Sequence, residues 1–364
     1  MDMIEKNGML DLMDRPAFSV GGGVILYANQ AARQRLITPG NSVLELFLTG
    51  KDDYEAFSGG CLYLTLSLAG QTCGASVSRI GDTDVFILED ETDLSELNAL
   101  ALASREIRGP LTNIMAVADQ TLPKLVREDE ASQIQLAQLN RGLYQLLRLV
   151  GNMSDALRYC TATNDHSETV ELRAFLDELL CTAAALAGDA RKQLHHTNLR
   201  QPLYCLIDRE MLERALNNMI SNAMKFTPRG GSIDVQCTRR GDRLYLSVAD
   251  TGDGIPSGIL GSVFTRYRRE PALEDNRYGI GLGLVLVRAA AARHGGTVLI
   301  DRPEGWGTRI TLSIAIRKAD QGAVRSRGLH MDYAGERNHA LTELSDVLPA
   351  QQYRTEDING ISGP

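Results

Sequence analysis

Three glycines alternate with apolar residues in the stretch from Arg277 to Leu284, directly before a segment of helical character, residues 285–294. Glycine lets the backbone approach a ligand because it has no Cβ and readily adopts positive φ. The first turn of a helix presents unpaired N–H groups and the positive end of the helix dipole. This combination is typical of a phosphate-binding loop. A dinucleotide fingerprint would also need a strand just before the glycines, and residues 271–277 are charged and poor in strand-forming residues.

A second polar set lies on the amphipathic helix that the sequence predicts over residues 209–225. Asn218, Asn222 and Lys225 are spaced by four and three residues, which places them on one helix face. Two amides and an ammonium group on one face can hold a hydrated divalent ion and a polyphosphate. A solvent-facing polar surface would give the same pattern, so this helix alone leaves both interpretations open.

A carboxylate follows the strand predicted over residues 243–248. Asp250 precedes Gly252 and Gly254, and a carboxylate beside flexible backbone suits recognition of the exocyclic amine of a base. Further strands are expected over 204–208, 232–237, 298–300 and 308–316, and a strand start followed by a helix over 170–186.

Two long helices are expected in the middle of the chain, over residues 93–122 and 129–159. In the second helix, apolar residues repeat every three and four positions, as in a heptad seam; they are Leu136, Leu139, Leu143, Leu146, Val150, Met153 and Leu157. A single hairpin would leave an apolar stripe exposed, so a four-helix bundle formed by a dimer is expected. The alternative is one hairpin buried against other parts of the same chain.

The composition limits the classes of function. The 364 residues allow two or three domains, and the formal charge of −8 without a large basic block argues against nucleic-acid binding. Six scattered cysteines form no metal-ligand spacing. No apolar run approaches the ~18 residues of a membrane span, and the acidic N-terminus is unlike a signal peptide. We therefore expect a soluble cytoplasmic protein.

Four motifs in order identify residues 93–316 as similar to sensor histidine kinases. They are an N box (Asn218 to Thr227), a first glycine box (Asp250 to Pro256), an F box (Phe264 to Tyr267) and a second glycine box (Gly279 to Leu284). The resemblance implies that ATP and Mg²⁺ bind here. Asn222 would ligate Mg²⁺ beside Asn218, Lys225 would contact phosphate, and Asp250 would accept from the adenine amine. The remaining nucleotide-binding residues that it implies are Gly252, Gly254, Ile255, Phe264, Tyr267, Gly279, Gly281, Leu282, Gly283, Leu284 and Thr308.

The first long helix contains a degenerate copy of the family's phosphoacceptor box, Ser104 to Thr112. The acceptor histidine is replaced by Arg105, whose guanidinium stays protonated and offers no lone pair to a phosphoryl group. The residue that would position a water for dephosphorylation is replaced by Gly109. Glu106, the family's catalytic base, has no histidine to activate and would then be a solvated carboxylate.

The N-terminal third is predicted to be a small α+β domain. Strands are expected over 16–20, 24–27, 61–68, 73–80 and 84–88, with a helix over 29–36. The segment Gly23 to Ala32 resembles the opening hairpin of PAS domains, which implies either ligand sensing or a domain that only dimerises and orients the rest of the chain. The fold class is thus α+β and multi-domain: a PAS-like sensor domain (1–90), a helical hairpin (91–162), a histidine-kinase-like ATP-binding domain (165–318) and a flexible C-terminal tail (319–364). For the ATP-binding domain the resemblance implies an α/β sandwich. Within the tail, one short helix is expected over residues 339–348.

The resemblance favours a function in two-component signal transduction. Because the acceptor is lost, the sequence predicts a pseudokinase-like regulator that binds ATP, forms a homodimer or a heterodimer with an active kinase through residues 93–159, and binds a response regulator. One alternative is an active histidine kinase that phosphorylates a partner in trans. A simple ATPase ranks last, because relatives of that kind use a glutamate where this chain has Asn218, and an amide accepts no proton.

Overall fold

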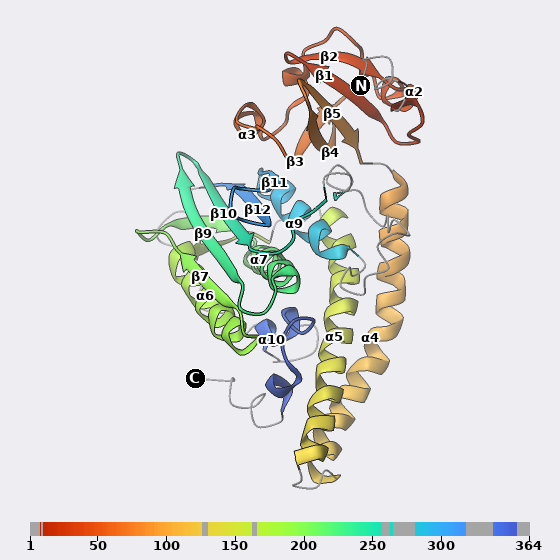
Figure 1. Ribbon diagram of the computed structural model, residues 1–364. Coiled ribbons are helices and arrows are strands. Elements are labelled where there is room, and N and C mark those ends of the chain that lie inside the picture. Colours follow the sequence, from red (N-terminus) through yellow and green to blue (C-terminus); the bar gives the residue numbers. More distant parts are fainter. Residues whose placement is uncertain are drawn as a thin grey trace.

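The computed structural model describes residues 8, 10–89, 91–125, 130–161, 166–256, 263–264, 281–317 and 338–354. The described chain is an α+β protein with an N-terminal β-rich unit, a long helical hairpin and an α/β unit beside it (Figure 1). One ten-stranded sheet passes through both β-containing units, in the order β2-β1-β5-β4-β3-β11-β12-β10-β9-β7. Within the described residues, no helix is both long enough and apolar enough to cross a membrane.

The N-terminal unit is an antiparallel sheet with short helices beside it. Its elements are β1 (Ala17–Gly21), β2 (Val24–Ala28), α2 (Gln30–Gln34), η1 (Val43–Leu46), α3 (Lys51–Glu55), β3 (Cys61–Leu68), β4 (Gln71–Ile80) and β5 (Thr83–Leu88). The buried Asn29 joins β1 to α2, because its Oδ1 accepts the N–H groups of Ala17 (3.1 Å) and Ala32 (2.9 Å). Phe18 and Phe86 stack in the core with ring centroids 4.7 Å apart.

The N-terminal unit and the α/β unit share their sheet, which the sequence did not predict. Strand β3 pairs antiparallel with β11 (Val298–Asp301), with Tyr63 opposite Val298. A Cβ on Gly60 would collide with the Ile300 carbonyl oxygen, so this approach needs glycine. Asp53 reinforces the junction, since its carboxylate accepts from the Tyr245 hydroxyl (2.9 Å) and from Thr297 Oγ1 (2.6 Å) and pairs with an arginine of the α/β unit.

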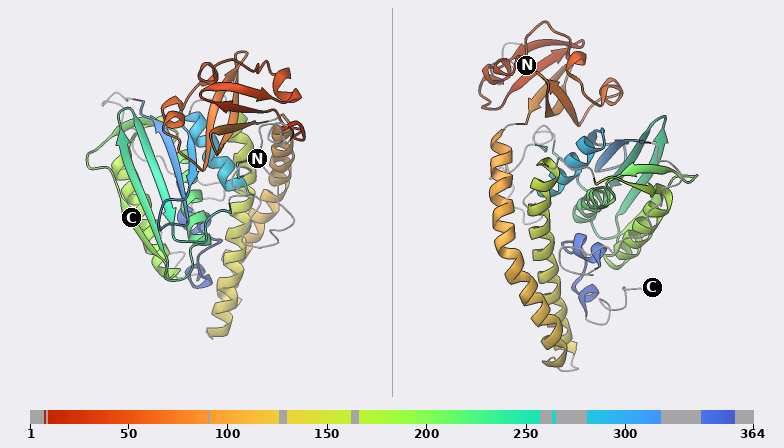
Figure 2. Two further views of the ribbon diagram at one scale, coloured as in Figure 1. Left: turned by 45° about the horizontal axis from the view of Figure 1, so that its top comes forward. Right: turned by 180° about the vertical axis from the view of Figure 1, so that it is seen from behind.

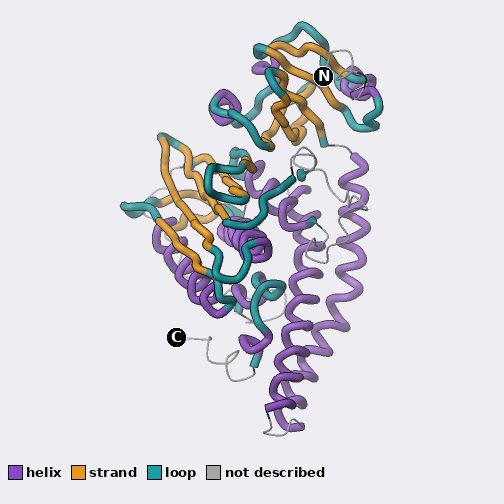
Figure 3. Tube along the Cα trace, viewed as in Figure 1, coloured by secondary structure: helices purple, strands orange, loops and turns teal. Residues whose placement is uncertain are grey.

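The helical hairpin consists of α4 (Glu91–Leu125) and α5 (Glu130–Thr161), which lie antiparallel along their length (Figures 1 and 3). Both predicted helices are therefore present. The predicted seam is only partly covered in the single chain, because Val150 and Met153 are buried whereas Leu139 and Leu146 are 47% and 48% exposed.

The α/β unit packs three helices on one face of the sheet. Its elements are β6 (Glu168–Glu171), α6 (Leu172–Asp189), β7 (Gln193–Thr197), β8 (Tyr204–Ile207), α7 (Arg209–Phe226), β9 (Ser232–Arg240), β10 (Arg243–Asp250), α9 (Leu282–Arg293), β11 and β12 (Thr308–Ala315). The inward residues alternate along β10, where Leu244, Leu246 and Val248 are buried. They form one core with the apolar stripe of α7.

Two local expectations were wrong. His195 and His196 lie in a strand that was not expected, β7, which pairs parallel with β9 at the edge of the sheet. An edge strand buries few side chains, so its sequence carries little of the apolar signal that predicts a strand. The short helix expected in the C-terminal tail is present as α10 (His339–Glu343). Residues 338–354 are not flexible as expected, because α10 and η2 (Ala350–Tyr353) pack between α5 and α7 (Figure 2).

Candidate nucleotide-binding site

Asp250 lies at the end of β10, directly opposite Thr308 at the start of β12. Both residues are buried, and Asp250 Oδ1 accepts the Gly252 N–H at 2.8 Å. Burial raises the pKa of Asp250, while hydrogen bonds from the backbone of Gly252 and Thr308 oppose that rise. The strand register therefore brings together two residues that are 58 positions apart and holds a carboxylate in a fixed orientation.

Glycines allow the loops around Asp250 to pack backbone against backbone. A Cβ on Gly252 would lie 2.6 Å from the Phe226 carbonyl oxygen, and one on Gly254, whose φ is +79°, would lie 2.8 Å from the Gly307 carbonyl oxygen. An open pocket of about 410 Å³ lies beside them, lined by Thr251, Gly252 and residues 302–307. The Asp250 carboxylate and the adjoining pocket suit the binding of a nucleotide base whose polar edge forms hydrogen bonds.

Asn218 marks the other end of the site, on α7. The helix begins at Asp208, whose side chain caps it by accepting the Met211 N–H at 3.0 Å. Asn218 is buried, and its Nδ2 donates to the Arg214 carbonyl oxygen at 2.8 Å. Asn222 and Lys225 are half-buried on the same helix. The three polar residues therefore lie on α7, as their spacing predicts.

The second glycine box reaches Asn218 at the start of α9. Gly281 precedes the helix with φ +79°, and a Cβ on Gly283 would lie 2.8 Å from Asn218 Oδ1. The N-terminus of α9 therefore lies against α7 because residue 283 has no side chain. Leu282 is buried and Leu284 is half-buried, so these two residues anchor the helix start.

Phe264 of the F box is buried and contacts the N-terminal unit. Its ring centroid lies 5.8 Å from that of Tyr63 on β3, and its carbonyl oxygen accepts from Arg288 Nη1 at 2.6 Å. Arg288 also pairs with Glu89 at 3.0 Å, just after β5. The half-buried Ile255 ends the first glycine box. Two predicted nucleotide-site residues, Tyr267 and Gly279, lie outside the described residues.

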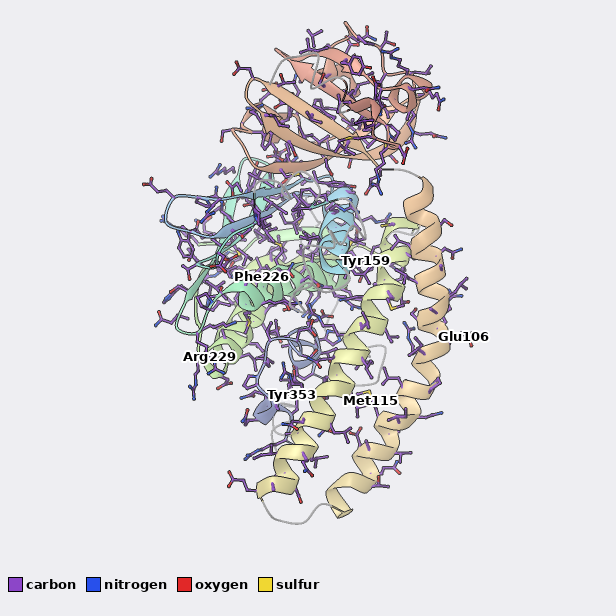
Figure 4. All side chains as sticks on the ribbon, turned by 45° about the vertical axis from the view of Figure 1, so that its right-hand side comes forward. Glu106, Met115, Tyr159, Phe226, Arg229 and Tyr353 are labelled. Carbon is purple, nitrogen blue, oxygen red and sulfur yellow. The ribbon has the colours of Figure 1, made fainter. Side chains whose placement is uncertain are left out.

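The degenerate acceptor box lies apart from these groups. Arg105 and Glu106 are exposed on α4, and α5 lies between α4 and the α/β unit (Figures 1 and 2). Figure 4 shows Glu106 on the outer side of α4, pointing away from Tyr159 of α5. The structure therefore groups Asp250, Gly252, Gly254 and Thr308 around one loop and sets Gly283 against Asn218. It does not bring Arg105 or Glu106 to either group.

A buried polar row on α5, which the sequence did not predict, faces α7. Arg148 Nη2 donates to Asn218 Oδ1 at 3.3 Å, Asn152 Oδ1 accepts from Arg214 at 3.1 Å, and Asp155 forms an ion pair with Arg214. The signal was present, because Arg148, Asn152 and Asp155 are spaced by four and three residues beside the apolar seam. Their partners could not be read from the sequence, because they lie about 60–70 positions further along the chain.

Comparisons with known proteins agree with this site. Residues 207–318 match the family described as histidine kinase-, DNA gyrase B- and HSP90-like ATPase. The sensor protein IrlS of Burkholderia pseudomallei is 32% identical over 203 residues, which are 54% of this chain and 42% of IrlS. The sensor histidine kinase WalK of Bacillus subtilis is 25% identical over 237 residues, which are 64% of this chain and 39% of WalK. A crystal structure of full-length ShkA in complex with AMPPNP is 24% identical, with a TM-score of 0.49, covering 61% of this chain and 46% of ShkA.

The family match defines the kind of domain that residues 207–318 form. The chain carries an ATP-binding domain of the histidine kinase type. The similarity to the sensor protein IrlS and the sensor histidine kinase WalK extends beyond this domain, because the aligned segments of 203 and 237 residues are longer than residues 207–318. It spans less than half of the length of these curated relatives.

Around Asp250, the described residues fit an adenine nucleotide. Around Asn218, one contact opposes the binding of Mg²⁺. The cradle of Gly252, Gly254 and Gly307 exists only because these residues lack side chains. Asn218 Oδ1, by contrast, faces the Arg148 guanidinium at 3.3 Å. A cation beside this oxygen disfavours a second cation there, so the Asn218 oxygen does not fit Mg²⁺ while Arg148 donates to it.

Proposed function

We propose that this protein is a sensor-histidine-kinase homologue that binds ATP with Mg²⁺, does not phosphorylate its own hairpin, and regulates a two-component pathway as a pseudokinase. The replacement of the acceptor histidine by Arg105 carries the proposal. A guanidinium is protonated at every physiological pH and has no lone pair for phosphoryl transfer. Residues 93–159 contain no histidine that could substitute.

The nucleotide would bind between the two ends of the site. Asp250 would accept from the adenine amine with Thr308 beside it, Asn222 would ligate Mg²⁺ next to Asn218, and Lys225 would contact phosphate. The glycines of both boxes would let the backbone approach the ligand. The burial of Asp250 and the contact of Gly283 with Asn218 support these assignments.

Dimerisation through the hairpin is part of the same proposal. Large apolar side chains remain exposed along both helices of the single chain, which is unusual for a surface without a partner; they are Leu102, Ile107, Ile114, Val117, Ile134, Leu139 and Leu146. A second copy, or an active kinase with a similar hairpin, would cover them in a four-helix bundle. A response regulator is the expected binding partner of such an assembly.

The N-terminal unit would act as a PAS-like domain that senses or orients. Its strand order, β2-β1-β5-β4-β3, and the capping role of Asn29 support this assignment. The shared sheet and the Asp53 contacts favour orientation of the ATP-binding domain. We propose the division of the chain at residues 90, 162 and 318 on the same grounds.

Incubation with radiolabelled ATP tests the proposed loss of self-phosphorylation. We expect no acid-labile phosphate on residues 93–159 of the wild-type protein, because Arg105 is no acceptor. Arg105→His restores an imidazole at that position, and Arg105→Gln is the matched control because it removes the charge without supplying a nucleophile. Label on the hairpin of the wild-type protein would overturn the proposal. Label on a partner histidine would support the alternative of an active kinase acting in trans.

A further inference from the structure

The C-terminal segment, residues 338–354, is docked between the hairpin and the ATP-binding domain (Figures 1 and 2). Four of its apolar side chains have no exposed surface; they are Leu341, Leu344, Leu348 and Tyr353. The Tyr353 ring lies 5.2 Å from that of Tyr144 on α5, and its hydroxyl donates to the Leu341 carbonyl oxygen at 2.7 Å. Figure 4 shows Tyr353 beside α5. Apolar burial of this extent indicates a specific docked segment.

Polar groups of α5 recognise the backbone of this segment. Asn140 Nδ2 donates to the Tyr353 carbonyl oxygen at 3.0 Å. Arg141 donates to the carbonyl oxygens of Ser345 (3.2 Å) and Asp346 (3.0 Å). The Ser345 and Asp346 carbonyl oxygens lie just after the end of α10. Backbone acceptors at the end of a helix have no partner within the helix. The α5 surface is therefore complementary to the segment in both apolar and polar groups.

The acidic side chains of the segment hold two buried arginines at the nucleotide site. Glu343 Oε1 lies 3.1 Å from Arg214 Nη2, and Glu343 Oε2 lies 3.6 Å from Arg148 Nε. Asp346 pairs with Arg148 Nη1 at 2.6 Å. The other end of the same guanidinium donates to Asn218 Oδ1. The docked segment thus fixes a positive charge against the side-chain oxygen of Asn218.

We infer that residues 338–354 are a built-in competitor of Mg²⁺-ATP at the Asn218 end of the site. The docked segment keeps Arg148 on Asn218, and this guanidinium opposes a metal ion there. The carboxylates of Glu343 and Asp346 also oppose the negative polyphosphate. This inference rests on the proposed roles of Asn218 and Asn222 in the preceding subsection.

The polar contacts of the docked segment are suited to release. Glu343 Oε2 and Arg148 Nε are buried and make no hydrogen bond within the described part of the chain. Buried charges that are only partly hydrogen-bonded regain solvation when they are exposed. Because coupling between two sites is reciprocal, a segment that weakens Mg²⁺-ATP binding must itself be released by Mg²⁺-ATP.

Two readouts on the full chain test the inference. Leu344→Asp places a charge in the apolar contact of the segment without touching the nucleotide site, and we expect it to tighten Mg²⁺-ATP binding by about tenfold, within the usual range of coupling between sites. Affinity is measured by displacement of a fluorescent nucleotide. Leu12→Asp, at a residue that is 85% exposed in the N-terminal unit, is the matched control. Hydrogen exchange of residues 338–354 should be slow without nucleotide and become faster with Mg²⁺-ATP.

Glu343→Gln is the second variant and keeps the side-chain shape. We expect it to tighten Mg²⁺-ATP binding as well, with Glu45→Gln, an exposed carboxylate on η1, as the control for lost charge. Unchanged affinity in both segment variants, with exchange of the segment unaffected by saturating Mg²⁺-ATP, would overturn the inference while leaving ATP binding intact. If no variant or wild-type protein binds nucleotide, the proposed function itself fails.

Discussion

Replacing Asp250 by asparagine is expected to weaken nucleotide binding without unfolding the protein. The side chain is buried, and one carboxylate oxygen already accepts the Gly252 N–H at 2.8 Å. Asparagine has nearly the same shape and keeps an oxygen for that hydrogen bond, so the loop geometry should persist. Its NH₂ group would then face the adenine amine, which places a donor against a donor. We therefore expect weaker ATP binding without loss of the fold.

The size of the effect depends on the hydrogen bond that is lost. A hydrogen bond to a charged group contributes about 1.5–3 kcal/mol, and each 1.4 kcal/mol is tenfold in the dissociation constant. Asp250→Asn should thus weaken ATP binding by about ten- to a hundredfold. Stability should not fall, because burial raises the pKa of Asp250 and a neutral amide avoids the cost of burying a charge.

Comparison of ATP with inosine triphosphate isolates the proposed contact. Inosine has no exocyclic amine, so the wild-type protein should prefer ATP and the Asp250→Asn variant should lose most of this preference. Asp253→Asn, an exposed carboxylate three residues later in the same loop, is the matched control. Displacement of a fluorescent nucleotide gives both affinities, and a thermal melt checks the fold.

The outcome that refutes the adenine assignment is specific. If Asp250→Asn binds ATP as tightly as the wild-type protein and the ratio of ATP to inosine triphosphate affinity is unchanged, Asp250 does not read the amine. A variant that melts at a much lower temperature would instead show that the carboxylate holds the loop together.

Three further predictions concern stability and assembly. Burial lowers the pKa of His294, whose Nε2 accepts the Asp208 N–H at 3.1 Å. As the pH falls below about 6.5, this histidine therefore binds a proton in the unfolded chain but not in the folded protein, which lowers stability. Between pH 7 and 5.5, the melting temperature of the His294→Gln variant should fall less than that of the wild-type protein. Leu146→Asp should shift the protein toward monomer in light scattering, because Leu146 is 48% exposed on α5, whereas the same change at the exposed Leu48 should not. Asp53→Asn should speed hydrogen exchange in β3 and β11 by about ten- to a hundredfold, the equivalent of a charged hydrogen bond worth about 1.5–3 kcal/mol; equal exchange rates would show that the shared sheet does not depend on this carboxylate.

The sequence predicted local geometry better than the contacts between distant elements. The residues of the N box and the glycine boxes are close in sequence, so local spacing shows which of them share a helix face or a turn. The strand register that sets Asp250 against Thr308 follows from two long apolar strands of matching alternation. The sequence did not predict strand β7, because an edge strand needs little apolar character.

The residue types alone determine that position 105 offers no nucleophile, since the chemistry of a guanidinium does not depend on where the chain places it. The repeating apolar positions likewise determine two long helices before any contact is known. Tertiary structure alone decided that β3 joins β11, that Asp53 reaches the α/β unit, and that Glu343 holds Arg148 against Asn218. These contacts link residues about 70–240 positions apart, and such pairings depend on the packing of whole elements rather than on any local pattern.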